Sequence, residues 1–382
     1  AAVILATPVM AFHDGGVAHC NGCHTMHNSQ DSLPMNGTDV DANGDPINGT
    51  AVGTGYPNLL LFANKSDVCL RCHYGSPGSY HVWTDGGPNA PGPMKSGGNF
   101  VFLEEDNIND AHAGASNPIP GYAAGHTVLS GIAGNDPEGV NTFGPGAGTV
   151  NFPTSELGCS SCHDPHGNDS FRLLYRTGQQ ISYNGGTSVL TWAAEIEAEA
   201  ISVFSSENAN NYNYYLDGYS AWCSSCHEAF HEQWPGEFIH PSGSFMGGDT
   251  VASYNSYRGT TNCVAFPPTL ANPQCGNGIN DADAYYYLTP LQDTSFATTG
   301  PTAGATGTSQ VVCVSCHRSH ATSAPDAGRW DFNVTFLDED GDESGSYELP
   351  RLGAVGTYAD ANQRSMCNKC HGKDEFDELL VP

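Results

Sequence analysis

The chain contains six copies of the pentapeptide Cys-x-x-Cys-His, in which two thiols and an imidazole stand at a fixed spacing that suits attachment of a cofactor. Two thiols three residues apart lie about one helical turn from each other, so both can form thioethers with the vinyl groups of one porphyrin. The His that follows lies under the ring and can bind the iron. The pattern therefore predicts six covalently attached c-type haems. The attachment cysteines are Cys20, Cys23, Cys69, Cys72, Cys159, Cys162, Cys223, Cys226, Cys313, Cys316, Cys367 and Cys370. The proximal iron ligands are His24, His73, His163, His227, His317 and His371.

Zinc binding is the alternative interpretation of these motifs, because zinc ribbons also contain Cys-x-x-Cys. Zinc ribbons need such sequences in pairs, and zinc gives no reason for a His directly after all six. Haem attachment explains both features, and it is the interpretation we favour.

Two of the 14 cysteines, Cys263 and Cys275, lie outside the motifs. They flank a segment that contains Pro267, Pro268 and Pro273. A disulfide between Cys263 and Cys275 is expected if the protein folds in an oxidising compartment. Two unrelated thiols are the alternative, since a disulfide also requires the two Cα atoms to lie close together.

The first eleven residues are apolar and end in Val9-Met10-Ala11, with small or branched side chains where a signal peptidase cleaves. We interpret residues 1–11 as the remnant of a signal peptide, with Phe12 as the first residue of the mature chain. Retention of this segment is the alternative. No later segment approaches the run of about eighteen apolar residues that a membrane span needs. The sequence thus predicts an exported protein without a membrane span.

The acidity of the chain restricts its partners. The formal net charge is −29, which argues against binding to nucleic acid or to anionic lipid. Copies of such a chain also repel each other at low salt. Self-association must then depend on extensive packing or on shared ligands rather than on charge attraction.

The fold class follows from the composition. With 46 Gly and 24 Pro in 382 residues, the sequence predicts a loop-rich protein, mostly coil with short helices and little strand. At about 64 residues per haem, six stacked haems are expected to form much of the core. We expect one hexahaem domain over residues 12–382, in which short helices carry the motifs. The one convincing amphipathic helix is predicted near residues 192–204.

The spacing of the motifs indicates no fixed repeat. Successive motifs are separated by 49, 90, 64, 90 and 54 residues, counted between their first cysteines. An aspartate-rich segment, Asp39 to Asp45, resembles the first half of a calcium loop. However, Thr50 stands where the bidentate Glu is needed, so we predict an acidic turn without calcium.

The sixth ligand of each iron decides the function. Two His for each of six irons need twelve, and 16 are present, so bis-His ligation leaves no iron open to substrate. His19 and His112 are predicted to be surface residues. The six distal ligands are expected among His13, His27, His81, His126, His166, His231, His240 and His320.

Four of these His follow a motif by three or four residues: His27, His166, His231 and His320. Residues three or four apart on a helix point the same way, whereas two axial ligands must approach the iron from opposite faces. None of the four is therefore expected to serve the haem of its own motif. Each is available to another haem, which would hold neighbouring porphyrins in close contact.

Several segments resemble the OmcS-type hexahaem outer-surface cytochromes of metal-reducing bacteria. The segment from Phe12 to Ser29 is similar to the start of these proteins. Further similarity lies in the order of all six motifs and in the elements Ser79-Tyr80-His81, Gly125-His126 and His240-Pro241. The motif segments that match are Cys159 to Gly167, Cys313 to Ala321 and Cys367 to His371. The resemblance spans nearly the whole chain.

This resemblance implies that copies polymerise into an extracellular filament with a continuous stack of haems. Such a protein is secreted through the periplasm of a bacterium, accepts electrons from upstream outer-membrane or periplasmic cytochromes, and delivers them to minerals or other external acceptors. The resemblance also implies that His27 binds the haem of Cys313, Cys316 and His317 in the neighbouring subunit. The Cys263 and Cys275 pair and the intervals between motifs depart from the family pattern.

Two other functions stay open at this point. A monomeric periplasmic electron shuttle uses the same bis-His chemistry and differs only in assembly. A multihaem reductase needs one open iron, often marked by Lys in place of the proximal His, and all six motifs here end in His. The sequence therefore predicts an electron-transfer protein rather than an enzyme.

Overall fold

The structure of the protein is a computed structural model. It describes all six Cys-x-x-Cys-His motifs and much of the chain between them. The described residues are 20–24, 57–62, 64–75, 80–84, 95–104, 121–128, 130–131, 141–200, 207, 211–231, 240–256, 286, 288–301, 304–332 and 366–371. Several predictions lie outside the described residues: the signal-peptide remnant at residues 1–11, the Asp39 to Asp45 loop, the Cys263–Cys275 disulfide, and His13, His19, His27 and His112.

Irregular backbone dominates the described residues, and the predicted fold class is confirmed. The helices and strands are short, as expected for a chain so rich in Gly and Pro. The α-helices are α2 (Lys65–His73), α3 (Gly121–Ala124), α4 (Cys159–Cys162), α5 (Tyr219–Cys223), α6 (Gly248–Ser256), α7 (Phe296–Thr299) and α8 (Cys313–Cys316). The 3₁₀ turns are η1 (Cys20–Gly22), η2 (Pro57–Leu59), η3 (Phe100–Leu103), η5 (Thr154–Glu156), η6 (Phe171–Leu173), η7 (Glu228–Phe230), η10 (Pro325–Ala327) and η12 (Met366–Lys369).

Three two-stranded antiparallel sheets complete the described architecture. Strand β1 (Gln180–Tyr183) pairs with β2 (Ser188–Thr191) as a hairpin, with Gln180 opposite Thr191. Strand β3 (Glu197–Glu199) pairs with β4 (Tyr214–Asp217), and a bulge follows Glu197. Strand β5 (Ser244–Phe245) pairs with β6 (Gln310–Val311).

The helix predicted near residues 192–204 is wrong. Trp192 to Ile196 is irregular, and Glu197–Glu199 form β3. Trp192 and Ile196 are both buried, and the Trp192 ring stacks on Trp222 with centroids 4.1 Å apart. The Ala193 N–H donates to Ser225 Oγ at 2.9 Å. Packing against the fourth motif therefore outweighs the local preference of this segment for helix.

Among the described residues, apolar side chains form clusters beside the motifs. One contains Leu70 and Trp83 and packs on Cys159. A second contains Trp192 and Trp222 and packs on Cys162 of the third motif and on both cysteines of the fourth. A third contains Tyr254 and packs on Cys370. Each cluster thus buries at least one cysteine that is predicted to hold a porphyrin.

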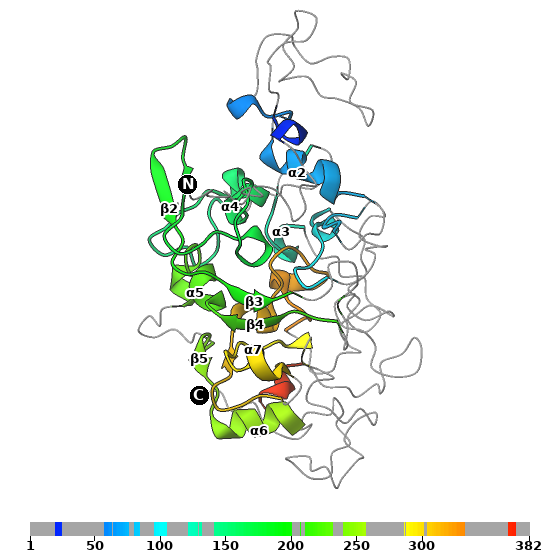
Figure 1. Ribbon diagram of the computed structural model, residues 1–382, viewed down its shortest axis with the longest axis vertical. Coiled ribbons are helices and arrows are strands. Elements are labelled where there is room, and N and C mark those ends of the chain that lie inside the picture. The colour runs from blue at the N-terminus through cyan, green and yellow to red at the C-terminus, as the bar shows by residue number, and fades with distance from the viewer. Residues whose placement is uncertain are drawn as a thin grey trace, which may run out of the picture.

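The motifs are spread along the longest axis of the molecule. Figure 1 shows η1 and α2 toward one end, α4 and α5 nearer the middle, and η12 beside α6 toward the other end. In the part of the chain that the structure describes, no helix has the length and apolar character that a membrane span requires.

Two sections of the chain fold in the same way, although the motif intervals as a set indicate no fixed repeat. Helix α2 packs on α4, and α5 packs on α8. The Cys159 N–H donates to Ser66 Oγ at 3.3 Å, and the Cys313 N–H donates to Ser220 Oγ at 3.3 Å. Ser220 follows Ser66 by 154 residues, as Cys313 follows Cys159.

The equivalence continues beyond these contacts. In both α4 and α8, a serine of the helix accepts a hydrogen bond from the residue that directly precedes the helix. Ser161 Oγ accepts from Gly158 N–H at 3.1 Å, and Ser315 Oγ accepts from Val312 N–H at 3.0 Å. We call residues 65–74 with 158–176 the first repeat, and residues 219–228 with 312–330 the second repeat. The interval of 90 residues that occurs twice between motifs marks this duplication.

Gly98 lies where the backbone passes close to the distant segment at Ala321, and its substitution tests this contact. Its φ is +86°, and an added Cβ would lie 2.2 Å from Ala321 O. Gly178 is a matched control, with a φ of +78° and nothing within 4 Å of the added Cβ. We expect G98A to lower the free energy of unfolding by roughly 1–3 kcal/mol more than G178A, because both introduce strained dihedrals and only G98A adds a clash. Denaturant unfolding of the two variants measures the difference; equal losses would contradict the packing described here.

Candidate haem sites

Each Cys-x-x-Cys-His motif occupies one helical turn, as predicted. The N–H of the motif His donates to the carbonyl of the first cysteine at 2.9 Å in the first motif and at 3.0 Å in the third. The two cysteine side chains therefore project from one turn, with the His directly after them. The elements that carry the motifs are η1, α2, α4, α5 with the turn that follows it, α8 and η12.

A backbone carbonyl orients the imidazole of five motif His. In each case Nδ1 lies within hydrogen-bonding distance of that carbonyl, and since a carbonyl only accepts, Nδ1–H is the donor. The other ring nitrogen, Nε2, is then the unprotonated one that can bind a metal. The pairs are His24 with Asn58 O at 2.9 Å, His73 with Tyr80 O at 2.7 Å, His163 with Arg172 O at 2.8 Å, His227 with Pro145 O at 2.7 Å, and His317 with Asp326 O at 2.8 Å.

Three of these carbonyls belong to left-handed turns. Asn58, Arg172 and Asp326 have φ of 57°, 53° and 59°, and the residue after each is also left-handed. Left-handed conformation at residues other than Gly costs of order 1–3 kcal/mol each and concentrates at functional sites. Here the strained turns hold the His of the first, third and fifth motifs. No feature of the sequence alone indicates these turns.

Four motif His face a second imidazole from a distant part of the chain. An iron bound to two imidazoles, with a typical metal–nitrogen bond of about 2.0 Å, holds the ring centroids about 6 Å apart. The observed separations match this requirement, so the residues present fit haem iron. The centroid distances are 6.4 Å for His24 and His166, 6.4 Å for His163 and His320, 5.8 Å for His227 and His126, and 6.0 Å for His371 and His240.

Two of the second imidazoles, His126 and His320, are half-buried. Burial, with the nearby imidazoles His227 and His163 adding to it, lowers the pKa of His126 to about 4 and that of His320 to about 3. Both side chains are therefore neutral at physiological pH, which is the form that binds a metal. The His126 Nδ1–H also donates to Ser319 O at 2.7 Å, so its Nε2 is directed away from that carbonyl.

The remaining candidates are arranged differently. His81 lies in a loop that folds back on the second motif, where the Val82 N–H donates to His73 O at 2.9 Å. His231 is exposed, and its ring lies near Gly243. The ring contact recorded for His317 within the described residues is Phe332, at 5.2 Å, and not a second imidazole.

Neighbouring motifs follow one another in space in the order of the chain. The Cys69 and Cys159 sulfurs interact, which raises the pKa of Cys69 and lowers that of Cys159. Cys223 and Cys313 interact in the same way. The thiols of the other neighbouring motifs are close enough to raise the pKa of one another: Cys72 acts on Cys23, Cys226 on Cys162, and Cys367 and Cys370 on Cys316.

The sequence analysis assumed that a His three residues after a motif lies on the same helix as the motif His. This geometry does not occur in the third and fifth motifs. Helix α4 ends at Cys162 and α8 ends at Cys316, so His166 and His320 lie in turns and not on the motif helices. The expectation that they face another motif agrees with the structure, where His166 lies by His24 and His320 by His163. The serines that join the motif helices, Ser66 and Ser220, are site residues that the sequence analysis missed.

The described sites are those of a multihaem c-type cytochrome. No family model matches the chain. The chain is 30% identical to the C-type cytochrome OmcS of Geobacter sulfurreducens, over 98% of this chain and 97% of that protein, and it belongs to the OmcS family of c-type cytochromes. It is also similar to two solved structures of OmcS filaments from Geobacter sulfurreducens, one described as cryo-EM of nanowires. In both, the TM-score is 0.68 and the identity is 28%, over 95% of this chain and 100% of the filament chain.

The two helix-joining serines provide a test of the repeated arrangement. Ser66 and Ser220 are buried, and each accepts a hydrogen bond from the first N–H of the next motif helix. We expect S66A and S220A each to lower the free energy of unfolding by about 1 kcal/mol, because a buried N–H loses its acceptor. The control S188A, on the β1–β2 hairpin, is expected to stay within about 0.5 kcal/mol of the parent. Chemical denaturation of the haem-loaded protein gives the values; a cost for only one of the two serines would argue against equivalent repeats.

Proposed function

We propose that the chain binds six c-type haems with two His on each iron and transfers electrons along them by outer-sphere hopping. The observation that carries this proposal is the set of four imidazole pairs at the separation that one iron requires. When bound, each haem supplies a one-electron couple at its iron. The protein sets the position, orientation and surroundings of each ring.

The proposed distal ligands are six of the eight His selected from the sequence. Those supported by ring separations serve the first, third, fourth and sixth motifs. His81 is assigned to the second motif because its loop folds back over His73. His13 and His231 are then the two that bind no iron. The distal ligands in chain order of the motifs are His166, His81, His320, His126, His27 and His240.

The assignment of His27 follows from a regular pattern: a His that comes three residues after one motif lies by the proximal His of the motif two places earlier in the chain. His166 follows the third motif by three residues and lies by the proximal His of the first motif. His320 follows the fifth motif by three residues and lies by the proximal His of the third. His27 follows the first motif by three residues, so the same displacement places its partner in another subunit.

The haem of the fifth motif is the proposed binding partner of His27. In this motif, His317 is oriented by Asp326 O, as four other motif His are oriented by backbone carbonyls, and within the described residues its ring lies beside the phenyl ring of Phe332. A bond from His27 of one subunit to the haem of Cys313 and Cys316 in the next would join the two haem chains. Coordination and interface burial would then offset the repulsion between copies of net charge −29, which salt also screens.

The proposed biological role is that of a filament subunit at the cell exterior. The related OmcS forms nanowires, and the order of the motifs in this chain gives a path from one end of the subunit to the other. Identical subunits are the assembly partners, upstream cytochromes the electron donors, and minerals or other external acceptors the electron sink. With every iron held by two His, the protein is an electron carrier and not a reductase of a small substrate.

Replacement of single His residues tests the ligand assignment. We expect H126A to convert one of the six low-spin haems to a high-spin haem, because His126 lies 5.8 Å from His227 in the position of its second ligand. The control H231A removes an exposed His that follows the same motif by four residues, and it should leave all haems low-spin. Electron paramagnetic resonance of the ferric protein counts both species. High-spin haem in H231A and not in H126A would reverse the assignment.

The assembly proposal predicts that H27A abolishes filaments while retaining six haems. The loss is expected because the fifth haem no longer receives a ligand from the neighbouring subunit. H19A is the matched control, since it alters the same segment at a His that is assigned no iron. Negative-stain imaging and intact mass measure assembly and haem number. Discrete particles of the parent protein, with all haems low-spin, would favour the monomeric shuttle instead.

A further inference from the structure

The segment that follows the third motif carries axial ligands for two different irons in the proposed ligation. His163 is the proximal ligand of the third haem, and His166, three residues later, lies by His24 of the first motif. The rings of His24 and His166 are almost parallel, with 9° between their planes. His166 is exposed. Polar contacts, rather than burial, must therefore hold this ligand in place.

The residues from Asp164 to Gly167 form a tight turn with His166 as its third residue. The Gly167 N–H donates to Asp164 O at 3.1 Å, and Gly167 has a φ of +84°. Asp in the first position, Pro165 in the second and Gly in the fourth are residues that a β-turn favours. The position of His166 is thus set by a turn that these residue types stabilise.

The carboxylate of Asp164 adds a second bond across this turn. Its Oδ1 accepts from the His166 N–H at 2.9 Å. Asp and Asn form this bond readily, because their short side chains reach the backbone two residues further on. A hydrogen bond to an ionised acceptor is also stronger than one to a neutral carbonyl. The backbone of His166 is therefore held by the side chain that directly follows His163.

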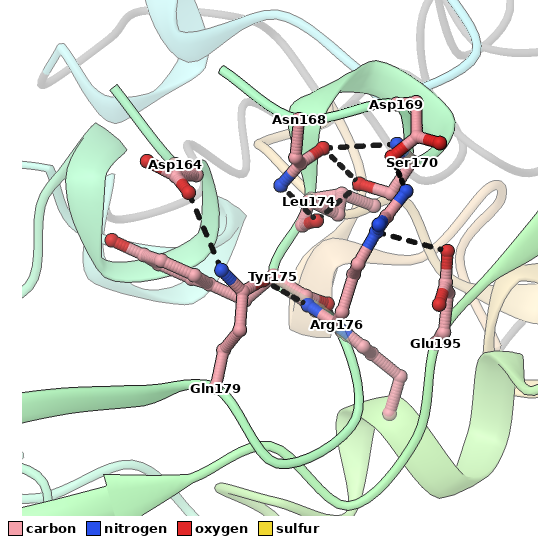
Figure 2. Close-up of polar contacts among 10 residues, drawn as sticks. Asp164, Asn168, Asp169, Ser170, Leu174, Tyr175, Arg176, Gln179 and Glu195 are labelled. Carbon is pink, nitrogen blue, oxygen red and sulfur yellow. Dashed lines mark hydrogen bonds and ion pairs between the residues drawn. The ribbon is translucent and has the colours of Figure 1, made fainter. Parts of the chain in front are cut away.

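The carboxylate is itself held by the segment that leaves the loop, as Figure 2 shows. Gln179 Nε2–H donates to Asp164 Oδ2 at 3.4 Å. Gln179 Oε1 accepts from the Arg176 N–H at 2.6 Å. Nearby, Asn168 Nδ2–H donates to Leu174 O at 3.1 Å and joins the two sides of the loop. The two oxygens of Asp164 thus have separate partners, and the orientation of the carboxylate is fixed.

The backbone of Asp164 supports the proximal ligand of the third haem. Its N–H donates to Leu173 O at 2.8 Å. The carbonyl of the neighbouring Arg172 accepts from His163 Nδ1–H at 2.8 Å. Asp164 therefore contacts the supports of two ligands: its backbone binds the turn that orients His163, and its side chain binds the backbone of His166.

The second repeat holds its distal ligand in a different way. Arg318 stands at the position equivalent to Asp164, 154 residues later. The N–H of His320 donates to Gly97 O at 2.6 Å, in a distant segment, and His320 is half-buried. In both repeats the N–H of the distal His thus has an acceptor. For the exposed His166, that acceptor is the Asp164 carboxylate.

We propose that Asp164 is a positioning residue for the first iron. Its carboxylate holds His166 in place as the second axial ligand, although Asp164 belongs to the segment of the third motif. This inference rests on the proposed haem binding. A ligand on a fixed backbone returns to the iron soon after it dissociates, whereas a ligand on a loose turn leaves the position open to a small molecule. Loss of the Asp164 side chain therefore opens the first haem alone.

Binding of carbon monoxide to the reduced, haem-loaded protein tests the proposal. Carbon monoxide binds a ferrous haem only where an axial position becomes free, so its rate reports how firmly the second imidazole is held. We expect D164A to raise this rate about tenfold over the parent at one of the six haems, because a hydrogen bond to a carboxylate is lost. H166A is the reference for one open haem and is expected to bind at once.

Two conservative variants separate position from charge. D164N is expected to bind carbon monoxide like the parent, because an amide oxygen at the same place still accepts from the His166 N–H. D164E keeps the charge but places it one methylene further away, so it is expected to behave like D164A. D169A is the matched control. Asp169 is an exposed carboxylate of the same loop that pairs with Arg176, and its loss is expected to leave the rate unchanged.

The double variant D164A/H166A identifies the haem that opens. One carbon monoxide per protein is expected, as in H166A, because both changes act at the first iron. Two would mean that D164A opens another haem, and this would overturn the proposal. A parent-like rate in D164A would overturn it as well, and so would a fast rate in D164N with a parent-like rate in D164E. If D164A does not retain its haems, D164E decides.

The failure of this inference is distinct from that of the proposed function. Intact mass is measured first, and H166A is tested before the Asp164 variants. Fewer than six haems in the parent, or no carbon monoxide binding in H166A, would contradict the proposed ligation and with it this inference. With six haems and an open haem in H166A, the Asp164 variants test the positioning role alone.

Discussion

The hydrogen bond from an imidazole Nδ1–H to a backbone carbonyl is the interaction on which the rest of this structure depends. It is present at five of the motif His and fixes both the tautomer and the plane of each ring. A c-type haem is tethered by its thioethers, so the protein need not enclose it to retain it. What the backbone must do is orient the imidazole of each motif His. Strained left-handed turns at Asn58, Arg172 and Asp326 do this through their carbonyls. Short elements and long coil are then a consequence of holding many rings rather than one core.

The same constraint explains why distant segments meet. If each iron binds two imidazoles, as proposed, the second must come from outside the motif, and in the structure it comes from far along the chain: His166 lies by His24, and His126 lies by His227. The close approach of Gly125 to the backbone of His320 shows how tightly two such ligand segments are joined. Under the proposed ligation each distal ligand comes from outside its motif, so every iron would connect two parts of the protein. The proposed bond from His27 of one subunit to the haem of His317 in the next would extend this rule beyond one subunit.

Much of the site could be predicted from the sequence, because covalent haem attachment requires a fixed local pattern. The six motifs, the loop-rich fold and the eight candidate distal His follow from residue types and spacing. The pairing of those His could not be predicted, since it depends on contacts between residues far apart in the chain, with His163 and His320 about 160 residues apart. The helix expected near Trp192 failed for a related reason: burial against Trp222 outweighed local periodicity. The duplication left a trace in the repeated interval of 90 residues, but its contacts run through Ser66 and Ser220, which no short motif marks.

The most direct test of a continuous haem chain across subunits is cryo-electron microscopy of the assembled protein, read at the sixth ligand of the Cys313 haem. The account predicts filaments in which His27 of a neighbouring subunit occupies that position and the six haems follow the order of the motifs. A ligand from the same chain at that iron, such as His231, or discrete particles in place of filaments, would contradict it.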